Sequence, residues 1–164
     1  MAKPSMTDKN FKAGRAGLSA PFCVRDLGEY LLGHWRVERR VFDRCRGEIG
    51  TFSGELCFES GPGGLRATET GRMIYGETET DAERVLLYHF EGSTRARVLF
   101  SDGRFFHELD LGTGRARVSH LCGDDTYIGG FWVVSRDILL QRWRVLGPRK
   151  DLVLLGRLRR EVLR

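Results

Sequence analysis

The chain has 164 residues, with 27 Lys or Arg against 22 Asp or Glu and a formal net charge of +5 at pH 7. This length fits one domain with a single core, and the sequence shows neither an apolar run long enough for a membrane-spanning helix nor the apolar region of a secretory signal. Its 21 glycines and four prolines, together with short alternating segments, favour an antiparallel all-β fold over a helical one.

Residues 1–24 are expected to form a flexible leader, and residues 25–164 the folded domain. The leader is basic and has few apolar side chains, so it cannot bury enough surface to offset the entropy of ordering it. Deleting residues 1–20 should therefore leave the melting temperature nearly unchanged. The four cysteines form no CxxC pair, which fits reduced thiols in the cytoplasm. The alternative is a mitochondrial location, with the leader as a presequence.

A short helix is expected after the leader, followed by the first strand. Asp26 can cap the helix with Glu29 three residues on, and the helix should end by Gly33. From Trp35 to Val41 the pattern changes to strict alternation, which predicts a half-buried strand.

Further alternating segments follow, separated by turns rich in Gly, Pro, Asp and Ser, among them the stretch ETETD at 77–81. The expected strands are at 48–58, 64–75, 83–91, 94–101, 104–111, 115–122, 126–135, 138–146 and 151–162. About ten consecutive strands as an open sheet would leave two exposed edges, so we predict a closed antiparallel up-and-down β-barrel whose first and last strands pair. A two-sheet sandwich is the alternative.

The two ends of the predicted domain resemble the lipocalin, or more broadly calycin, signature. Gly33-His34-Trp35 opens the first strand, and the last strand carries Arg157, Arg159 and Arg160. The resemblance implies a lipocalin/calycin-like barrel in which an arginine of the last strand packs over the tryptophan. We expect Arg157 or Arg159 to cover the Trp35 indole.

A longer pattern resembles a family of small calycin-like proteins of unknown function. It reads Phe-x-Asp-Gly-Arg-x-Phe-His, then His-x-Cys-x-x-Asp-x-Tyr, then Trp-x-Val-x-Gly-Pro-x-Lys-Asp. The matching positions are Phe100, Asp102, Gly103, Arg104, Phe106, His107, His120, Cys122, Asp125, Tyr127, Trp143, Val145, Gly147, Pro148, Lys150 and Asp151. The chain departs from the pattern at Leu155, where the family usually has an aromatic residue. The resemblance implies the barrel and supplies no activity.

Two histidines share the apolar faces of neighbouring predicted strands. Alternation places His107 with Phe105 and Leu109, and places His120 with Val118 and Cys122. Keeping both apolar faces together makes His107 and His120 directly opposed or diagonal neighbours. Each buried ring without a hydrogen-bond partner would cost about 1–3 kcal/mol, so we interpret the pair as a functional wall. The bland alternative is two structural core histidines.

The candidate ligand-binding residues combine inward-facing polar groups with groups near the barrel mouth. They are Glu69, Arg84, Tyr88, His107, His120, Cys122, Tyr127, Trp143 and Lys150. Such a set suits a ligand with an apolar body and a polar or anionic head. A metal held by His107, His120, Cys122 and Asp125 is a weaker hypothesis, because no established metal motif is present.

Three functions remain open at this point. The first is an intracellular small-molecule-binding barrel; the second is an enzyme that uses the His/Tyr/Cys wall, with or without a metal; the third is a scaffold with a filled core, packed through Trp35, Phe106, Trp132 and Trp143. The sequence names no cofactor, ligand identity or oligomeric state. Nucleic acid is not the expected partner, because the basic C-terminal strand has no stacking aromatic residues near it.

Overall fold

The computed structural model describes residues 22–161, so the prediction for residues 1–20 lies outside the described part of the chain. Within that part the chain forms one short helix and ten antiparallel strands. They are α1 (Leu27–Leu31), β1 (Gly33–Asp43), β2 (Glu48–Gly61), β3 (Gly64–Tyr75), β4 (Thr78–Phe90), β5 (Arg95–Phe100), β6 (Phe105–Asp110), β7 (Arg115–Cys122), β8 (Asp125–Ser135), β9 (Ile138–Gly147) and β10 (Lys150–Arg160).

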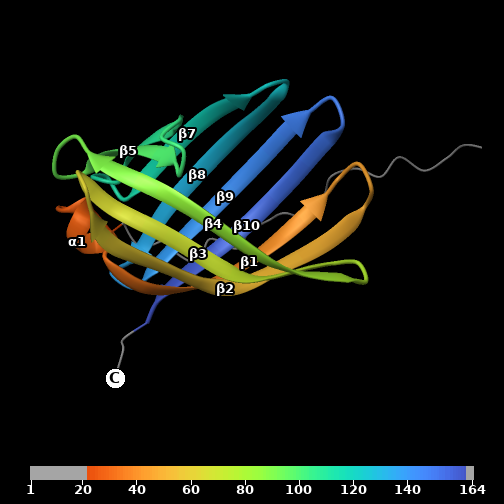
Figure 1. The fold of residues 1–164 in the computed structure, drawn as a ribbon, viewed down its shortest axis with the longest axis horizontal. Helices are drawn as coiled ribbons and strands as arrows, with labels where there is room; N and C mark the ends of the chain where they lie inside the picture. Colours follow the sequence, from red (N-terminus) through yellow and green to blue (C-terminus); the bar gives the residue numbers. More distant parts are fainter. Residues whose placement is uncertain (1–21, 162–164) are drawn as a thin grey trace, which may run out of the picture.

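The strands form one sheet that curls into a nearly closed barrel (Figure 1). Its order is β6-β5-β4-β3-β2-β1-β10-β9-β8-β7, so the first strand pairs with the last, with Trp35 opposite Arg160 and Asp43 opposite Leu152. The predicted all-β up-and-down barrel and the pairing of its first and last strands are thus confirmed. The two ends of the sheet, β6 and β7, are not hydrogen-bonded neighbours, so the barrel has a seam there.

Helix α1 lies at one end of the barrel, where it covers the apolar core (Figure 1). The Asp26 carboxylate accepts a hydrogen bond from the Glu29 amide at 2.8 Å, which is the cap that the sequence predicts. Leu27 and Leu31 are almost fully buried, and the Trp35 indole nitrogen donates to the Leu31 carbonyl at 2.8 Å. This end of the interior is therefore filled by protein. On the N-terminal side of the predicted boundary at residue 24, Val24 is also buried.

An arginine of β10 does cover the Trp35 indole, but it is Arg160 rather than Arg157 or Arg159. The Arg160 guanidinium carbon lies 4.3 Å from the ring centroid, and the side chain donates to the Leu32 carbonyl at 2.9 Å and to the Tyr30 carbonyl. Arg157 and Arg159 are exposed because they alternate with buried Gly156 and Leu158. The expectation was wrong by strand parity, since Arg160 shares the inward face with Leu158.

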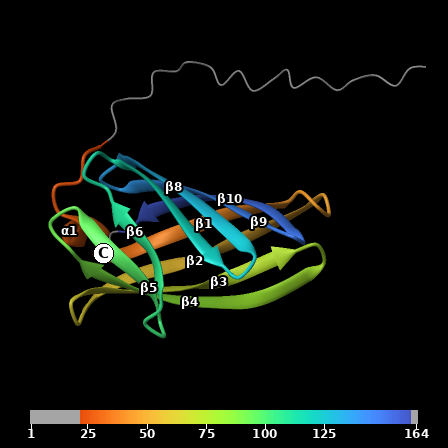
Figure 2. The same ribbon diagram turned by 90° about the horizontal axis from the view of Figure 1, so that it is seen from above.

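At the end of the barrel opposite α1, one side of the wall is shorter than the rest. The reason is that β5 and β6 have six residues each, whereas β4 has 13. Strand β4 pairs with β5 only from Leu86 to Phe90. The stretch ETETD, expected as a turn, lies largely within β4 and pairs with β3, which extends this hairpin beyond β5 and β6 (Figure 2). Solvent reaches the inward face here, since the side chain of Arg84 is 46% exposed.

Candidate functional site

A buried ion pair lies on the inward face of β1, β3 and β4. The Arg39 guanidinium donates to both carboxylate oxygens of Glu69, at 3.1 and 2.8 Å, and Arg84 donates to one of them at 3.3 Å. The side chains of Arg39 and Glu69 are only 9% and 7% exposed. Burial alone would raise the pKa of Glu69, but Arg84 and Arg39 outweigh it, so this pKa lies below its ordinary value. The three groups together carry one excess positive charge.

His107 faces the interior and is 3% exposed. Its Nδ1 lies 3.0 Å from the Glu108 carbonyl oxygen, which can only accept, so Nδ1 carries the proton and Nε2 is left as an acceptor. Burial lowers the pKa of His107 from 6.5 to about 4, and the charges of Arg84 and His120 act in the same direction. The ring is therefore neutral at pH 7 and points one acceptor nitrogen into the barrel.

A bulge in β6 changes which phenylalanine faces inward. The β5–β6 register runs from Val98 opposite His107 to Leu99 opposite Phe105, so Phe106 is the extra residue. Phe106 is 7% exposed and stacks on Trp143 at 5.5 Å and 11°, whereas Phe105 is 44% exposed. The expectation that Phe105 shares the face of His107 was wrong, because alternation fails wherever a residue is inserted.

The two histidines are not cross-strand neighbours as expected, because β6 and β7 do not pair. Both contact the Phe106 ring, whose centroid is 4.6 Å from His107 and 5.1 Å from His120. His120 also contacts Phe100 and Tyr127, at 5.6 and 6.1 Å. The histidines therefore belong to one aromatic wall without direct pairing between them.

The remaining candidates are divided between the interior and the rim. Tyr88 is buried against Phe58, and burial raises its pKa to about 12. Cys122 is exposed at the last position of β7, so it is not enclosed by the interior. Lys150 is exposed at the first position of β10, where its ammonium group lies 2.6 Å from an Asp125 carboxylate oxygen.

Trp132 does not fill the core, contrary to the expectation for a solid barrel. It is 38% exposed on the outer face of β8, between the buried residues Phe131 and Val133. Two residues of the inner site, Arg39 and Phe106, were not among the candidate ligand-binding residues. Arg39 could have been found, because alternation places this arginine on the apolar face of its strand. That Phe106 and His107 both face inward could not, because a bulge has no clear sequence signal.

Several inward-facing polar side-chain atoms have no hydrogen-bond partner in the protein, and they are not fully buried either. Among residues 22–161, the only fully buried side-chain nitrogen or oxygen without a hydrogen-bond partner is Nε of Arg160. His107 Nε2, Tyr88 Oη and Trp143 Nε1 have no partner either, so each must touch space that solvent can enter. The inner wall thus offers one acceptor and two donors to a guest.

The described part of the chain contains no group of three or more His, Cys, Asp or Glu side chains arranged to hold a metal ion. The set of His107, His120, Cys122 and Asp125 is therefore not assembled as a metal centre. Nor does any helix between residues 22 and 161 have the length and hydropathy needed to cross a membrane.

Comparison with known proteins gave a family and a fold. Residues 31–160 match DUF6314, a family of unknown function. An S-type phycobiliprotein lyase, CPES from Guillardia theta, superposes with a TM-score of 0.64 at 9% identity, covering 87% of this chain and 95% of that one. A DUF3598 protein of unknown function from Nostoc punctiforme superposes at 0.58 with 18% identity, covering 87% of this chain and 51% of that one. No curated protein matched.

Proposed function

The chain belongs to the family of unknown function DUF6314, and we propose that this protein binds, inside its barrel, a small molecule with an apolar body and an anionic head. The observation that carries the proposal is the set of inward polar atoms, His107 Nε2, Tyr88 Oη and Trp143 Nε1, that have no protein partner but remain open to solvent. A core built only for stability would pair or replace such groups, because each one costs free energy when it is desolvated.

The charge of the interior supports an anionic head. Two guanidinium groups, from Arg39 and Arg84, face the single carboxylate of Glu69, and the low pKa of His107 keeps that ring uncharged at pH 7. Arg39 is buried and makes two bonds to Glu69, whereas Arg84 makes one longer bond and is half exposed. Arg84 is therefore the group that would bind the head.

The aromatic wall supports an apolar body. Phe106 and Trp143 are stacked, and Phe100 and His120 extend the same surface toward the side of the barrel where the wall is shorter. Ligand pockets in proteins are lined mainly by such apolar and aromatic groups, with a few polar groups that set the orientation. The phycobiliprotein lyase shares this fold at 9% identity, and a shared fold does not transfer an activity.

Native mass spectrometry of the purified full chain tests the proposal by detecting any co-purifying ligand. Dodecanoate is then added as a probe, and its binding is measured by calorimetry. We expect a co-purifying organic mass or a dodecanoate complex in the wild type. Arg84→Gln should weaken dodecanoate binding about tenfold or more, because a charge-assisted hydrogen bond is lost. Arg66→Gln is the matched control, since Arg66 is exposed on the outer face of β3.

A native mass spectrum that shows only the mass of the protein, together with no dodecanoate binding, would overturn the proposal and favour the scaffold hypothesis. Equal weakening by Arg84→Gln and Arg66→Gln would also contradict it, because the effect would then follow net charge rather than position. His107→Leu tests the same wall without changing the charge, because His107 is neutral at pH 7. This substitution should reduce the amount of ligand that co-purifies.

A further inference from the structure

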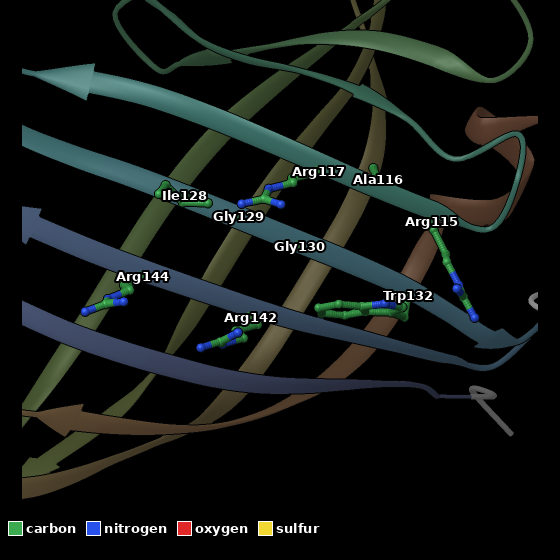
Figure 3. Close-up of a pocket in the computed structure, with 9 residues that line it drawn as sticks. All are labelled: Arg115, Ala116, Arg117, Ile128, Gly129, Gly130, Trp132, Arg142 and Arg144. Carbon is green, nitrogen blue, oxygen red and sulfur yellow. The ribbon is translucent and has the colours of Figure 1, made fainter. Parts of the chain in front are cut away.

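A second hollow lies on the outer face of the barrel, over β7, β8 and β9 (Figure 3). Its volume is about 490 Å³, within the size range of small-molecule sites. It does not share residues with the inner wall. The lining residues are Arg115, Ala116, Arg117, Ile128, Gly129, Gly130, Trp132, Arg142 and Arg144. We call it the outer groove.

Three of its four arginines have no acidic partner. Arg144 lies 3.3 Å from an Asp151 carboxylate oxygen. Arg115, Arg117 and Arg142 are exposed, and none of them forms an ion pair or a side-chain hydrogen bond with any residue from 22 to 161. Three unneutralised guanidinium groups around one hollow repel each other, so the groove favours an anion.

The strand register fixes the spacing of these arginines. Gly130 of β8 lies directly between Arg117 of β7 and Arg142 of β9. The two arginines therefore stand on strands about 9–10 Å apart, and the residue between them has no side chain of its own. Arginine forks bind phosphate oxygens in a bidentate way, so these two arginines can hold one phosphate group above the strand that separates them.

The indole of Trp132 is the side chain that reaches into the space over Gly130. A Cβ atom added to Gly130 would lie 2.7, 3.2 and 3.4 Å from three atoms of the six-membered ring, so the ring leans back over Gly130. Figure 3 shows Arg115 on one side of the indole and Arg117 and Arg142 on the other. The absence of a side chain at Gly130 is thus what makes room for the indole there.

We propose that the outer groove binds a nucleotide unit, with its base stacked on Trp132 and its phosphate held by Arg117 and Arg142. The unit is either a free nucleotide or one residue of a single strand. Stacking of a base on an exposed aromatic ring and phosphate contacts to arginine are the two interactions by which single-stranded nucleic acid is bound without sequence preference. An acidic peptide would use the arginines but would leave the exposed indole without a role.

The groove continues across the sheet, and this continuation distinguishes a single strand from a free nucleotide as the occupant. A neighbouring hollow of about 590 Å³ shares Trp132 and Arg142 with it, and is also lined by Arg40, Leu155 and Arg157. In the register, Arg142 faces Leu155, which in turn faces Arg40. A single strand could therefore extend from the outer groove toward β1, whereas a free nucleotide would occupy the first hollow alone.

The sequence did not suggest this site, because its arginines and its aromatic residue come from three different strands. The basic C-terminal strand has no stacking residues near it in the sequence, and Trp132 was named only as a core residue of the scaffold hypothesis. Folding brings Trp132 onto the same face as Arg142 and Arg157, because Trp132 lies opposite Leu140 and Leu140 lies opposite Arg157.

Binding of AMP, adenosine and a short oligothymidylate to the full chain, at one fixed ionic strength, tests the proposal. Arg117→Ala/Arg142→Ala should weaken AMP binding about tenfold or more and leave adenosine binding unchanged. Gly130→Ala should push the indole off the sheet and weaken both AMP and adenosine about fivefold or more. The matched control is Arg25→Ala/Arg66→Ala, which removes the same charge from exposed positions outside the groove.

The site is supported whether AMP or oligothymidylate binds, provided that the groove variants weaken binding and the control does not. A single strand is identified if the oligothymidylate binds more tightly than AMP and if Arg40→Ala and Arg157→Ala also weaken its binding. A free nucleotide is identified if the oligothymidylate and AMP bind equally well. The proposal is overturned if the wild type binds neither probe, or if the control weakens binding as much as Arg117→Ala/Arg142→Ala. Circular dichroism checks folding, and Trp132→Leu replaces Gly130→Ala if that variant unfolds.

Discussion

Replacing Glu69 with leucine should destabilise the protein strongly, because it strands a buried cation. Glu69 accepts two hydrogen bonds from Arg39, whose side chain is 9% exposed and stands over the Phe52 ring at 5.2 Å. Removing one partner of such a pair costs about 3–5 kcal/mol. Arg84 adds little to the loss, since it can turn to water. For a domain of this size, about 2–4 °C per kcal/mol gives a fall in melting temperature of about 6–20 °C.

Thermal and urea unfolding followed by circular dichroism measure this effect, with Arg39→Met/Glu69→Leu as the comparison. The double variant replaces the pair by apolar groups and should regain most of the lost stability. The pKa of Glu69 is lowered from 4.5, so its contribution is present above that pH and is lost as the pH falls through the folded-state pKa. The double variant should lack this acid sensitivity. A loss below about 1 kcal/mol for Glu69→Leu, or an equally unstable double variant, would refute the reasoning.

Two further predictions concern His107 and Arg160. Burial lowers the pKa of His107 from 6.5 to about 4, so as the pH falls the unfolded chain takes up a proton before the folded chain does. The wild type should lose up to about 3 kcal/mol between about pH 6.5 and pH 4 from this residue, and urea titrations should show that His107→Leu removes the loss. Arg160→Met removes the contact with the Trp35 indole and the bonds to two carbonyls, and should cost about 2–4 kcal/mol; Arg157→Met, at an exposed position, should change the melting temperature little, and equal effects of the two would contradict the assignment.

Local patterns in the sequence were sufficient for the elements and for most of their faces. Alternation from Trp35 to Val41 placed Arg39 with the apolar residues, and Arg39 is buried. The Asp26 cap and the Gly-rich turns are likewise short-range features, because a turn or a cap depends on residues within a few positions of each other. The need to remove sheet edges then led to the pairing of β1 with β10.

The tertiary structure alone decided which residues meet. The bulge at Phe106 reverses parity within β6, and the seam between β6 and β7 keeps His107 and His120 from pairing, so that both contact the Phe106 ring instead. Glu69 finds Arg39 across 30 positions of sequence, and the outer groove takes residues from three strands. Periodicity reports only which side of its own strand a residue occupies. Register, bulges and sheet closure depend on the packing of distant segments, and these set the distances on which both proposed sites rest.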